Sequence, residues 1–207
     1  MSTATPSIPS DTLPDSETLE KAGRLTVFDD EGKKVEFKSI FAAKKTIVVF
    51  VRHFFCGICQ AYVSELTKIP PKALEDANAQ VVVIGCGQWN LIKNYARDTK
   101  FTGKIYADPT RELYKSLGMT IETLQGTPKG EKLRSYIPSG IVMDALRSIW
   151  RGPLQNPLSI GKQGNISQLG GDFVFGPGIQ CSYARPMKHT QDHIEVADLM
   201  AAAGISP

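Results

Sequence analysis

The chain has 207 residues, which suffices for one large domain or two small ones with a buried core. Hydrophobic residues make up 42% and charged residues 22% of the sequence, as in ordinary globular proteins. The 24 basic and 21 acidic residues leave a net charge of +3 without a Lys/Arg block, which excludes an evident nucleic-acid-binding surface. No apolar stretch approaches the roughly 18–20 residues of a membrane span, so we expect no membrane contact.

The first residues are rich in Ser, Thr, Pro and Asp and lack the features of a signal peptide. This composition favours a flexible arm over residues 1–20, followed by a single domain over residues 21–207. Four cysteines in a chain of this length do not predict a disulfide framework. Because thiols stay reduced in the cytosol, we expect a cytoplasmic protein whose cysteines serve redox chemistry or packing.

Strand and helix patterns alternate along the first part of the chain. Two short β patterns surround the turn sequence DDEGK and predict a hairpin. A nearly unbroken β-branched run at 46–52 is typical of a strand covered on both faces. The predicted elements are a hairpin of 25–28 and 34–37, strands at 46–52, 81–85 and 104–109, and helices at 57–68, 72–77, 90–99 and 110–117. Such alternation implies parallel strands joined by right-handed crossovers.

The end of the chain follows another pattern. Residues 171–178 and 179–185 predict two strands joined by a Gly-Pro-Gly turn, hence an antiparallel hairpin, before a helix at 192–203. The preceding residues, about 119–168, are an insertion, in which Ser139 and Gly152 bound a candidate helix. The whole order predicts an α/β fold of the thioredoxin-like type. It has a central mixed sheet flanked by helices, an N-terminal hairpin, and the insertion before the terminal hairpin and helix.

Two thiols, Cys56 and Cys59, stand where the strand at 46–52 turns into a helix. There Cys56 lies beside unpaired backbone N–H groups and the positive end of the helix dipole, which favour its thiolate. Cysteines so placed have pKa values roughly one to five units below the free value of about 8.5. Cys59 lies one helical turn further on the same face and can attack a bond formed at Cys56. We therefore predict that Cys56 attacks the substrate and Cys59 resolves the intermediate.

Other interpretations of the cysteines stay open. The pair can be two packing thiols, since free cysteine is often fully buried. Cys86 ends a strand at the same sheet edge as Cys56, which allows a third redox role beside the more common one in packing, and Cys181 is expected to pack. A zinc site would need further ligands at matched spacing, so we predict no metal and no cofactor. The remaining candidates are scattered: Cys86, Cys181, His53, His189 and His193.

The residues just before the motif are candidates for supporting the thiolate. Arg52 could raise the local positive potential, and His53 could shuttle a proton. Alternate side chains of a strand point to opposite faces, so we expect at most one of the two to face Cys56. We favour His53, because the chain must bend across Phe54-Phe55. A histidine bonded to a backbone carbonyl is the alternative. Phe54 and Phe55 are expected to pack around the site and limit water.

The sequence resembles the peroxiredoxin-like 2 family in four stretches: VVFVRHFFCGICQAYVSELTKIP, ADPTRELYKSLGM, LGGDFVFGPG and RPMKHTQDH. This family belongs to the alkyl hydroperoxide reductase/thiol-specific antioxidant superfamily, which has a thioredoxin fold. It includes the selenoprotein U proteins and prostamide/prostaglandin F synthase. The match runs in order from about Leu25 to Leu199. It implies redox-active Cys56 and Cys59 and a peroxide or endoperoxide reduced at the expense of thioredoxin or a small thiol.

The resemblance also assigns residues around the thiols. Arg185 matches a basic position of the family and is a candidate for substrate or thiolate contact, with a strand-end salt bridge as the alternative. The chain departs from peroxiredoxins proper, because His53 stands where they carry Thr and Gly170-Gly171 stands where they carry Arg. We expect the cleft beside Cys56 to have room for a larger substrate and to be lined by Phe55, Gly57, Gly170 and Gly171.

These features favour an antioxidant or peroxidase type of oxidoreductase, which reduces an organic peroxide or endoperoxide through a Cys56/Cys59 dithiol–disulfide cycle. One alternative is a protein thiol–disulfide oxidoreductase, and another is a non-redox binding or biosynthetic protein on the same fold. The insertion, with Trp150 between Arg147 and Arg151, could cover the cleft or present a partner surface. The oligomeric state is open, with a homodimer as one option.

Overall fold

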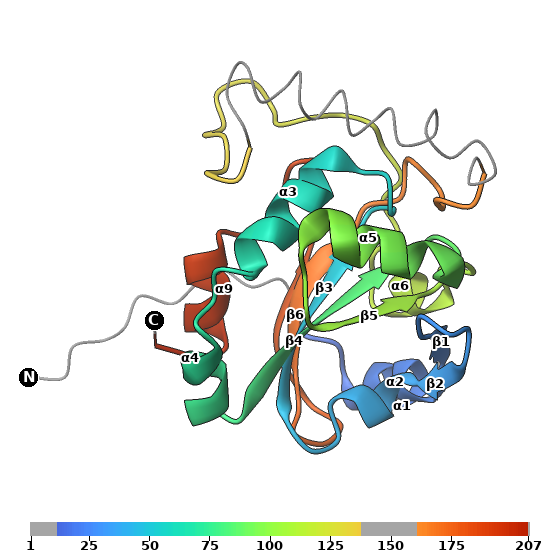
Figure 1. Cartoon of the computed structure of the whole chain (residues 1–207), viewed down its shortest axis with the longest axis vertical. Helices are drawn as coiled ribbons and strands as arrows, with labels where there is room; N and C mark the ends of the chain where they lie inside the picture. Colours follow the sequence, from blue (N-terminus) through green and yellow to red (C-terminus); the bar gives the residue numbers. More distant parts are fainter. Residues whose placement is uncertain (1–11, 138–160, 207) are drawn as a thin grey trace, which may run out of the picture.

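One mixed sheet runs through the part of the chain that the structure, a computed structural model, describes: residues 12–137 and 161–206 (Figure 1). Its strand order is β2-β1-β5-β4-β3-β6-β7. The strands are β1 (Thr26–Phe28), β2 (Lys34–Glu36), β3 (Lys45–Val51), β4 (Ala79–Gly85), β5 (Lys104–Ala107), β6 (Gly171–Phe175) and β7 (Cys181–Pro186). The helices are α1 (Ser16–Arg24), α2 (Phe37–Ile40), α3 (Gly57–Leu66), α4 (Pro71–Asp76), the 3-10 helix η1 (Trp89–Leu91), α5 (Ile92–Thr99), α6 (Glu112–Ser116) and α9 (Val196–Ala202).

The centre of the sheet is parallel and its flanks are antiparallel. β3, β4 and β5 are parallel neighbours, whereas β6 pairs antiparallel with β3, and β7 with β6. At the carboxyl end of the parallel pair, Val51 of β3 lies opposite Gly85 of β4. The chain therefore leaves both strands at one edge of the sheet, where folds of this kind place their ligands. The loop that carries Cys56 starts here.

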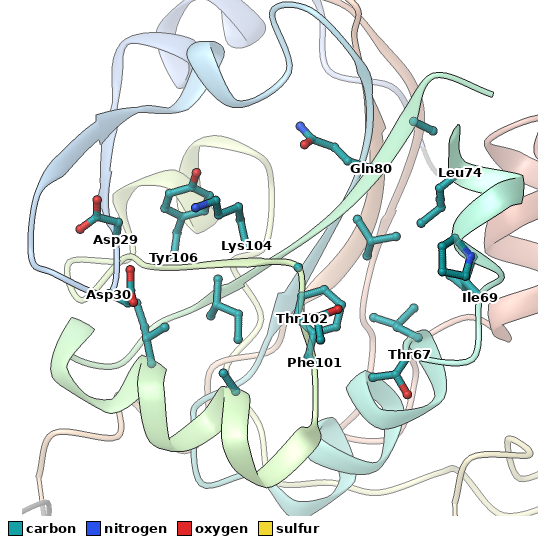
Figure 2. Close-up of a pocket in the computed structure, with 18 of the residues that line it drawn as sticks. Asp29, Asp30, Thr67, Ile69, Leu74, Gln80, Phe101, Thr102, Lys104 and Tyr106 are labelled. Carbon is teal, nitrogen blue, oxygen red and sulfur yellow. The ribbon is translucent and has the colours of Figure 1, made fainter. Parts of the chain in front are cut away.

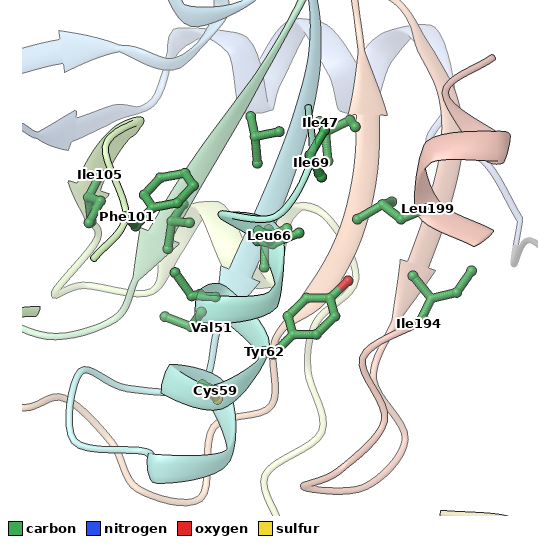
Figure 3. Close-up of a cluster of buried hydrophobic side chains, with 14 of the residues drawn as sticks. Ile47, Val51, Cys59, Tyr62, Leu66, Ile69, Phe101, Ile105, Ile194 and Leu199 are labelled. Carbon is green, nitrogen blue, oxygen red and sulfur yellow. The ribbon is translucent and has the colours of Figure 1, made fainter. Parts of the chain in front are cut away.

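Alternate residues of β3 face two separate cores, as expected for a strand in the middle of a sheet. Val49 and Val51 pack with α3, α5 and α9 in one core, which Figure 3 shows. Val48 and Phe50 pack with α1, α2 and α6 in the other. The whole of Ile47–Val51 is shielded from solvent. The apolar run that predicted a doubly covered strand is thus explained.

The predicted order of strands and helices is confirmed, with bounds that differ by a few residues. One predicted boundary was wrong: the arm was predicted to extend to residue 20, but α1 already begins at Ser16. The carboxylate of Asp15 accepts the N–H of Thr18 at 2.8 Å and caps this helix, and Leu19 is buried beneath it. Composition suggested an arm, but this cap and the apolar face of α1 tie the segment to the core. The candidate helix at 139–152, with Trp150, lies outside the described residues.

No helix in the described ranges is both long and apolar enough to cross a membrane.

The ends of β3 and β4 are joined by a tyrosine from α6. The hydroxyl of Tyr114 lies 2.7 Å from the carbonyl of Val51 and 2.8 Å from that of Ile84. Tyr114 is fully buried. Its hydroxyl therefore meets two carbonyls that water does not reach.

We expect Tyr114→Phe to lower the free energy of unfolding by about 1–3 kcal/mol, because it removes the hydroxyl that donates to two buried carbonyls. Tyr95→Phe is the matched control, since the Tyr95 hydroxyl is buried without a hydrogen-bond partner in the described residues. Urea denaturation of both variants measures the difference. Equal effects of the two substitutions would contradict the role given to Tyr114.

Candidate active site

Cys56 is the N-cap residue of α3. Its backbone is extended, and its Sγ accepts the backbone N–H of Cys59 at 3.4 Å. Its own backbone N–H donates to the carbonyl of His53 at 3.1 Å, which closes the turn between β3 and the helix. The sulfur thus replaces the oxygen that a capping Ser or Asp would supply. A negative charge on this sulfur is favoured by the helix N-terminus.

A guanidinium also reaches the sulfur. Arg52 Nη1 donates to Cys56 Sγ at 3.5 Å, and Nη2 donates to the carbonyl of Ile166 at 2.6 Å. Arg52 is only 7% exposed, so little water weakens the attraction between its charge and a thiolate. Peroxiredoxins proper carry an arginine where this chain has Gly170-Gly171. Here the guanidinium beside the sulfur belongs to Arg52, which precedes the thiol motif in the sequence.

The preference for His53 over Arg52 was wrong. His53 is buried, and its Nδ1 has no hydrogen-bond partner in the described residues. Burial, helped by the charge of Arg52, lowers the pKa of His53 to about 3, so the ring stays neutral at physiological pH. The bend across Phe54-Phe55, which favoured His53, begins earlier than expected, because β3 already ends at Val51 and strand alternation no longer holds at residues 52 and 53.

The environment shifts the pKa values of the two thiols of the motif in opposite directions. A hydrogen bond from the Cys59 thiol, opposed by burial and supported by the charge of Arg52, lowers the pKa of Cys56 to about 6. Burial, followed by the interaction with Cys56, raises the pKa of Cys59 well above its ordinary value. These shifts favour a thiolate at Cys56 and a protonated thiol at Cys59 at neutral pH. Groups with such divergent pKa values in one site are typical of a division of roles.

The other two cysteines are not reactive. Cys86 is buried and donates its S–H to the carbonyl of Arg52 at 2.8 Å, and burial raises its pKa to about 12. Cys181 packs against the core on the α1 side of the sheet, and burial raises its pKa to about 11. The packing interpretation is therefore supported for both. Cys86 additionally holds the backbone from which Arg52 reaches Cys56.

The end of the predicted insertion contacts the residues around the thiols. The carbonyl of Gln163 accepts the N–H of Phe54 at 3.3 Å, the carbonyl of Lys162 accepts the N–H of Gln88 at 2.8 Å, and the carbonyl of Ile166 accepts from Arg52. Cys56 is 3% exposed and Cys59 is fully buried. Phe54 is buried against Gly85, where a Cβ would lie 2.5 Å from its ring. Phe55 and Ile58 are only partly buried and form an apolar margin near the thiols.

The glycine pair does not open a cleft as predicted. A Cβ on Gly170 would lie 1.7 Å from the carbonyl oxygen of Phe50, and one on Gly171 would lie 2.9 Å from the side chain of Phe173. Both positions are buried, and the space beside them is filled by neighbouring chain. Glycine is required because β3 approaches the backbone closely at this point. Gly57, the first residue of α3, is buried between the two thiols.

Arg185 does not contact Cys56 in the structure. It forms a salt bridge with Asp192, which the sequence left open as its alternative role. Arg134 binds the same carboxylate at 3.1 Å. Asp192, His189 and Glu131 place ligand atoms within 4.8 Å of one another, but the two guanidinium groups already neutralise Asp192. This cluster is therefore an ion-pair network rather than a metal site.

A buried Asp–His pair behind α3 was not predicted. His193 Nδ1 lies 2.9 Å from Asp172 Oδ1, and both residues are fully buried. The ring of His193 stacks on Tyr62 of α3 with centroids 4.4 Å apart. Asp172 lies on β6 and His193 follows β7, so no local spacing could have connected them.

A hollow of about 790 Å³ lies away from the thiols (Figure 2). It is bordered by the end of α3, by α4 and α5, and by the amino ends of β4 and β5, with Gln80, Phe101, Lys104 and Tyr106 among its walls. Cys56 stands at the opposite end of α3, about 15 Å along the helix axis. The hollow therefore does not receive a substrate of the thiols.

The fold and the thiol pair define a thioredoxin-like protein of the peroxiredoxin class. The model of the AhpC/TSA antioxidant enzymes matches residues 65–189. Human Peroxiredoxin-like 2C is 34% identical over 205 residues, which cover 96% of this chain and 86% of the relative. Prostamide/prostaglandin F synthase of Xenopus tropicalis is 29% identical over 166 residues, which cover 77% and 74%. The chain belongs to the AhpC/TSA antioxidant enzyme family and, within it, to the peroxiredoxin-like 2 proteins.

Solved structures agree with this fold. Peroxiredoxin Q of Xanthomonas campestris superposes with a TM-score of 0.54 at 11% identity, with 93% of each chain covered. Peroxiredoxin 6 of Arenicola marina gives 0.57 at 13% identity, with 86% of this chain and 68% of that chain covered. At such identities the likeness shows the fold alone. The family match also begins after Cys59, so the description of the thiols rests on their geometry here.

We expect Arg52→Met to raise the pKa of Cys56 by about one unit, because it removes a buried positive charge beside the thiolate. Arg52→Lys keeps the charge and should give a smaller rise. The pH dependence of thiolate absorbance near the ultraviolet edge, in a background of Cys86→Ser and Cys181→Ser, measures the midpoint. An unchanged midpoint in Arg52→Met would contradict the assignment.

We expect Gly170→Ala to destabilise the protein by at least about 1–3 kcal/mol, since its methyl group would collide with the β3 backbone. Gly126→Ala is the control, because a Cβ there meets its nearest neighbour, the Gln191 amide, at 3.4 Å. Thermal unfolding of the two variants measures the difference. A Gly170→Ala protein as stable as the parent would show that the strands are not in close contact here.

Proposed function

We propose that the protein is a thiol-dependent oxidoreductase that reduces an organic peroxide or endoperoxide through a Cys56/Cys59 dithiol–disulfide cycle. The observation that carries this proposal is the capped Cys56 sulfur with the Arg52 guanidinium at 3.5 Å, beside a protonated Cys59. Membership of the antioxidant family supports the oxidoreductase class. The closely spaced thiols supply both a nucleophile and a resolving group without a further cofactor.

In the first step the Cys56 thiolate attacks one oxygen of the substrate and the O–O bond breaks. With a hydroperoxide, the attacked oxygen stays on Cys56 as a sulfenic acid. The rest of the substrate is released as an alkoxide, which takes a proton to become an alcohol. With an endoperoxide, the attacked oxygen stays bonded to both Cys56 and the opened ring, as a sulfenate ester. The other oxygen becomes an alkoxide on the same molecule and takes a proton. Arg52 and the helix N-terminus stabilise the thiolate before attack, and the guanidinium also lies where negative charge builds up on the oxygens.

In the second step Cys59 loses its proton and attacks the Cys56 sulfur. The S–O bond breaks, and water or the alcohol leaves as the disulfide forms. An external dithiol such as thioredoxin, or a small thiol, then reduces the disulfide and restores both thiols. We place this cycle in the cytoplasm, where such reductants are abundant.

Two features support a small organic substrate. Cys56 is only 3% exposed, which hinders the in-line approach of a disulfide on a folded protein. This ranks the protein disulfide oxidoreductase second. The partly exposed side chains nearest to the motif, Phe55 and Ile58, are apolar and suit a hydrocarbon group. Relatives named prostamide/prostaglandin F synthase are consistent with an endoperoxide, whereas the glycine pair no longer supports a wider cleft.

We expect one equivalent of cumene hydroperoxide to remove two free thiols from the reduced protein and two hydrogens from its intact mass. Cys59→Ser should instead trap a sulfenic acid at Cys56, and Cys56→Ser should not react. Cys181→Ser is the control and should behave like the parent. Hydrogen peroxide in a parallel series ranks the two classes of peroxide.

The outcome separates the candidate functions. If all thiols stay reduced with both oxidants over minutes, the peroxidase proposal fails. Reduction of insulin disulfides in the same samples would then favour the protein disulfide oxidoreductase. If Cys56→Ser and Cys59→Ser leave the biological function intact, a non-redox role is favoured.

A further inference from the structure

Disulfide closure requires a proton acceptor for Cys59. Its thiol is fully buried, and burial raises its pKa, so it does not ionise readily by losing a proton to water. Yet only its thiolate can attack oxidised Cys56. The inner face of α3 must therefore hold a base, or closure is slow.

Three buried polar atoms around α3 have no hydrogen-bond partner in the described residues: His193 Nε2 and the hydroxyl oxygens of Tyr62 and Tyr95. A phenol is a poor proton acceptor, so the imidazole is the candidate base, and it contacts Tyr62. Both side chains are fully buried, and their rings stack in parallel, 4.4 Å apart with an interplanar angle of 5°. Tyr62 lies three residues after Cys59 on α3, and such residues are neighbours on one helix face. The stack therefore connects the imidazole to the helix face that carries Cys59.

Asp172 prepares His193 for this task. Its Oδ1 receives Nδ1 of His193 at 2.9 Å, and its Oδ2 accepts the N–H of Ile194 at 3.0 Å. A carboxylate on Nδ1 fixes the tautomer that leaves the lone pair on Nε2. It also stabilises the imidazolium that forms when Nε2 takes a proton. His53, the other buried histidine near the motif, has no carboxylate partner in the described residues and lies beside the positive charge of Arg52.

We propose that the Asp172–His193 pair is the proton acceptor of the dithiol, with Tyr62 as the positioning residue between it and α3. When Cys59 attacks the Cys56 sulfur, the proton of the Cys59 thiol moves to His193 Nε2. It then passes to the group that leaves Cys56, as water or an alcohol forms. His193 returns to the neutral state, and no electrons pass through it.

The inference rests on the dithiol cycle proposed above, but its test does not require a peroxide. The Cys56 thiolate attacks the methylthio sulfur of methyl methanethiosulfonate, so a methyl disulfide forms at Cys56 as the thiosulfonate S–S bond breaks and methanesulfinate leaves. Cys59 then displaces methanethiol, so the Cys56–Cys59 bond forms as the S–SCH3 bond breaks. Quenched samples analysed by intact mass follow the loss of the methylthio group, and this rate is measured against pH.

Several groups surround the His193 ring and have to be considered in the pH profile. Asp172 from β6 and Tyr62 from α3 touch it, and the Tyr136 hydroxyl donates to its backbone carbonyl at 3.1 Å. From β7, Arg185 and Tyr183 act on Asp172 and Tyr62, and the charge of His193 also lowers the pKa of Cys56. The Cys56 midpoint is therefore measured in each variant.

We expect His193→Gln to slow methanethiol loss on the order of 10²-fold, the usual contribution of a general base. The parent rate should rise with pH to a plateau, whereas the variant rate should lack this inflection. Asp172→Asn keeps the ring in place and should slow the step less strongly. His53→Gln tests the other buried histidine near the motif as the base. In each protein, formation of the Cys56 methyl disulfide shows that the first thiol still reacts.

The results separate this inference from the dithiol cycle itself. Unchanged closure in His193→Gln, or slower closure only in His53→Gln, would overturn the assignment of the base and leave the cycle intact. If Cys56 reacts but closure never occurs in the parent, the cycle fails instead. Should both buried-pair variants unfold, histidine nitrogen NMR of the parent decides. The Nε2 signal of His193 must then titrate over the same pH range as the closure rate.

Discussion

A sulfur atom takes the place of a capping oxygen at the start of α3, and much of the site depends on this substitution. The Cys56 sulfur receives the Cys59 N–H and the Arg52 guanidinium, so its negative form is bonded from two sides. The same turn brings the Cys59 thiol close enough to lower the pKa of Cys56. A hydroxyl at this position would cap the helix equally well but would not ionise at neutral pH. The chemistry therefore follows from which atom completes the helix end.

The sheet holds this helix end in place through the carboxyl ends of β3 and β4. Tyr114 contacts the carbonyl of Val51, the last residue of β3, and that of Ile84, the last but one of β4, and Cys86 donates to the carbonyl of Arg52. Arg52 is thus fixed by its backbone and by its side chain. A fixed guanidinium in a site with little water interacts with a thiolate more strongly than a mobile surface arginine would. The fold contributes rigidity here, and the loop contributes the charge.

The sequence predicted the thiol junction well because that information is local. A β-branched run, two cysteines and a helical pattern occupy one short stretch, so the placement of both thiols at the start of a helix follows from secondary structure alone. The choice between Arg52 and His53 failed because it depends on how the chain turns after Val51. The glycine pair was misinterpreted because its neighbour, the Phe50 carbonyl, lies more than a hundred residues earlier in the chain. Asp172 and His193 meet only through the pairing of β6 with β7 and the return of the chain beneath α3.

Arg52 holds two partners of different kinds. Its contact with Cys56 depends on a charge that disappears when the sulfur is oxidised, whereas its hydrogen bond to the carbonyl of Ile166 does not. In the proposed dithiol cycle, the backbone at Ile166 is therefore held by an arginine whose other contact changes once in every turnover. The reduced site would hold Arg52 through an ion contact and a hydrogen bond, and the oxidised site through the hydrogen bond alone. The hold on this stretch of backbone would thereby depend on the number of electrons in the thiols.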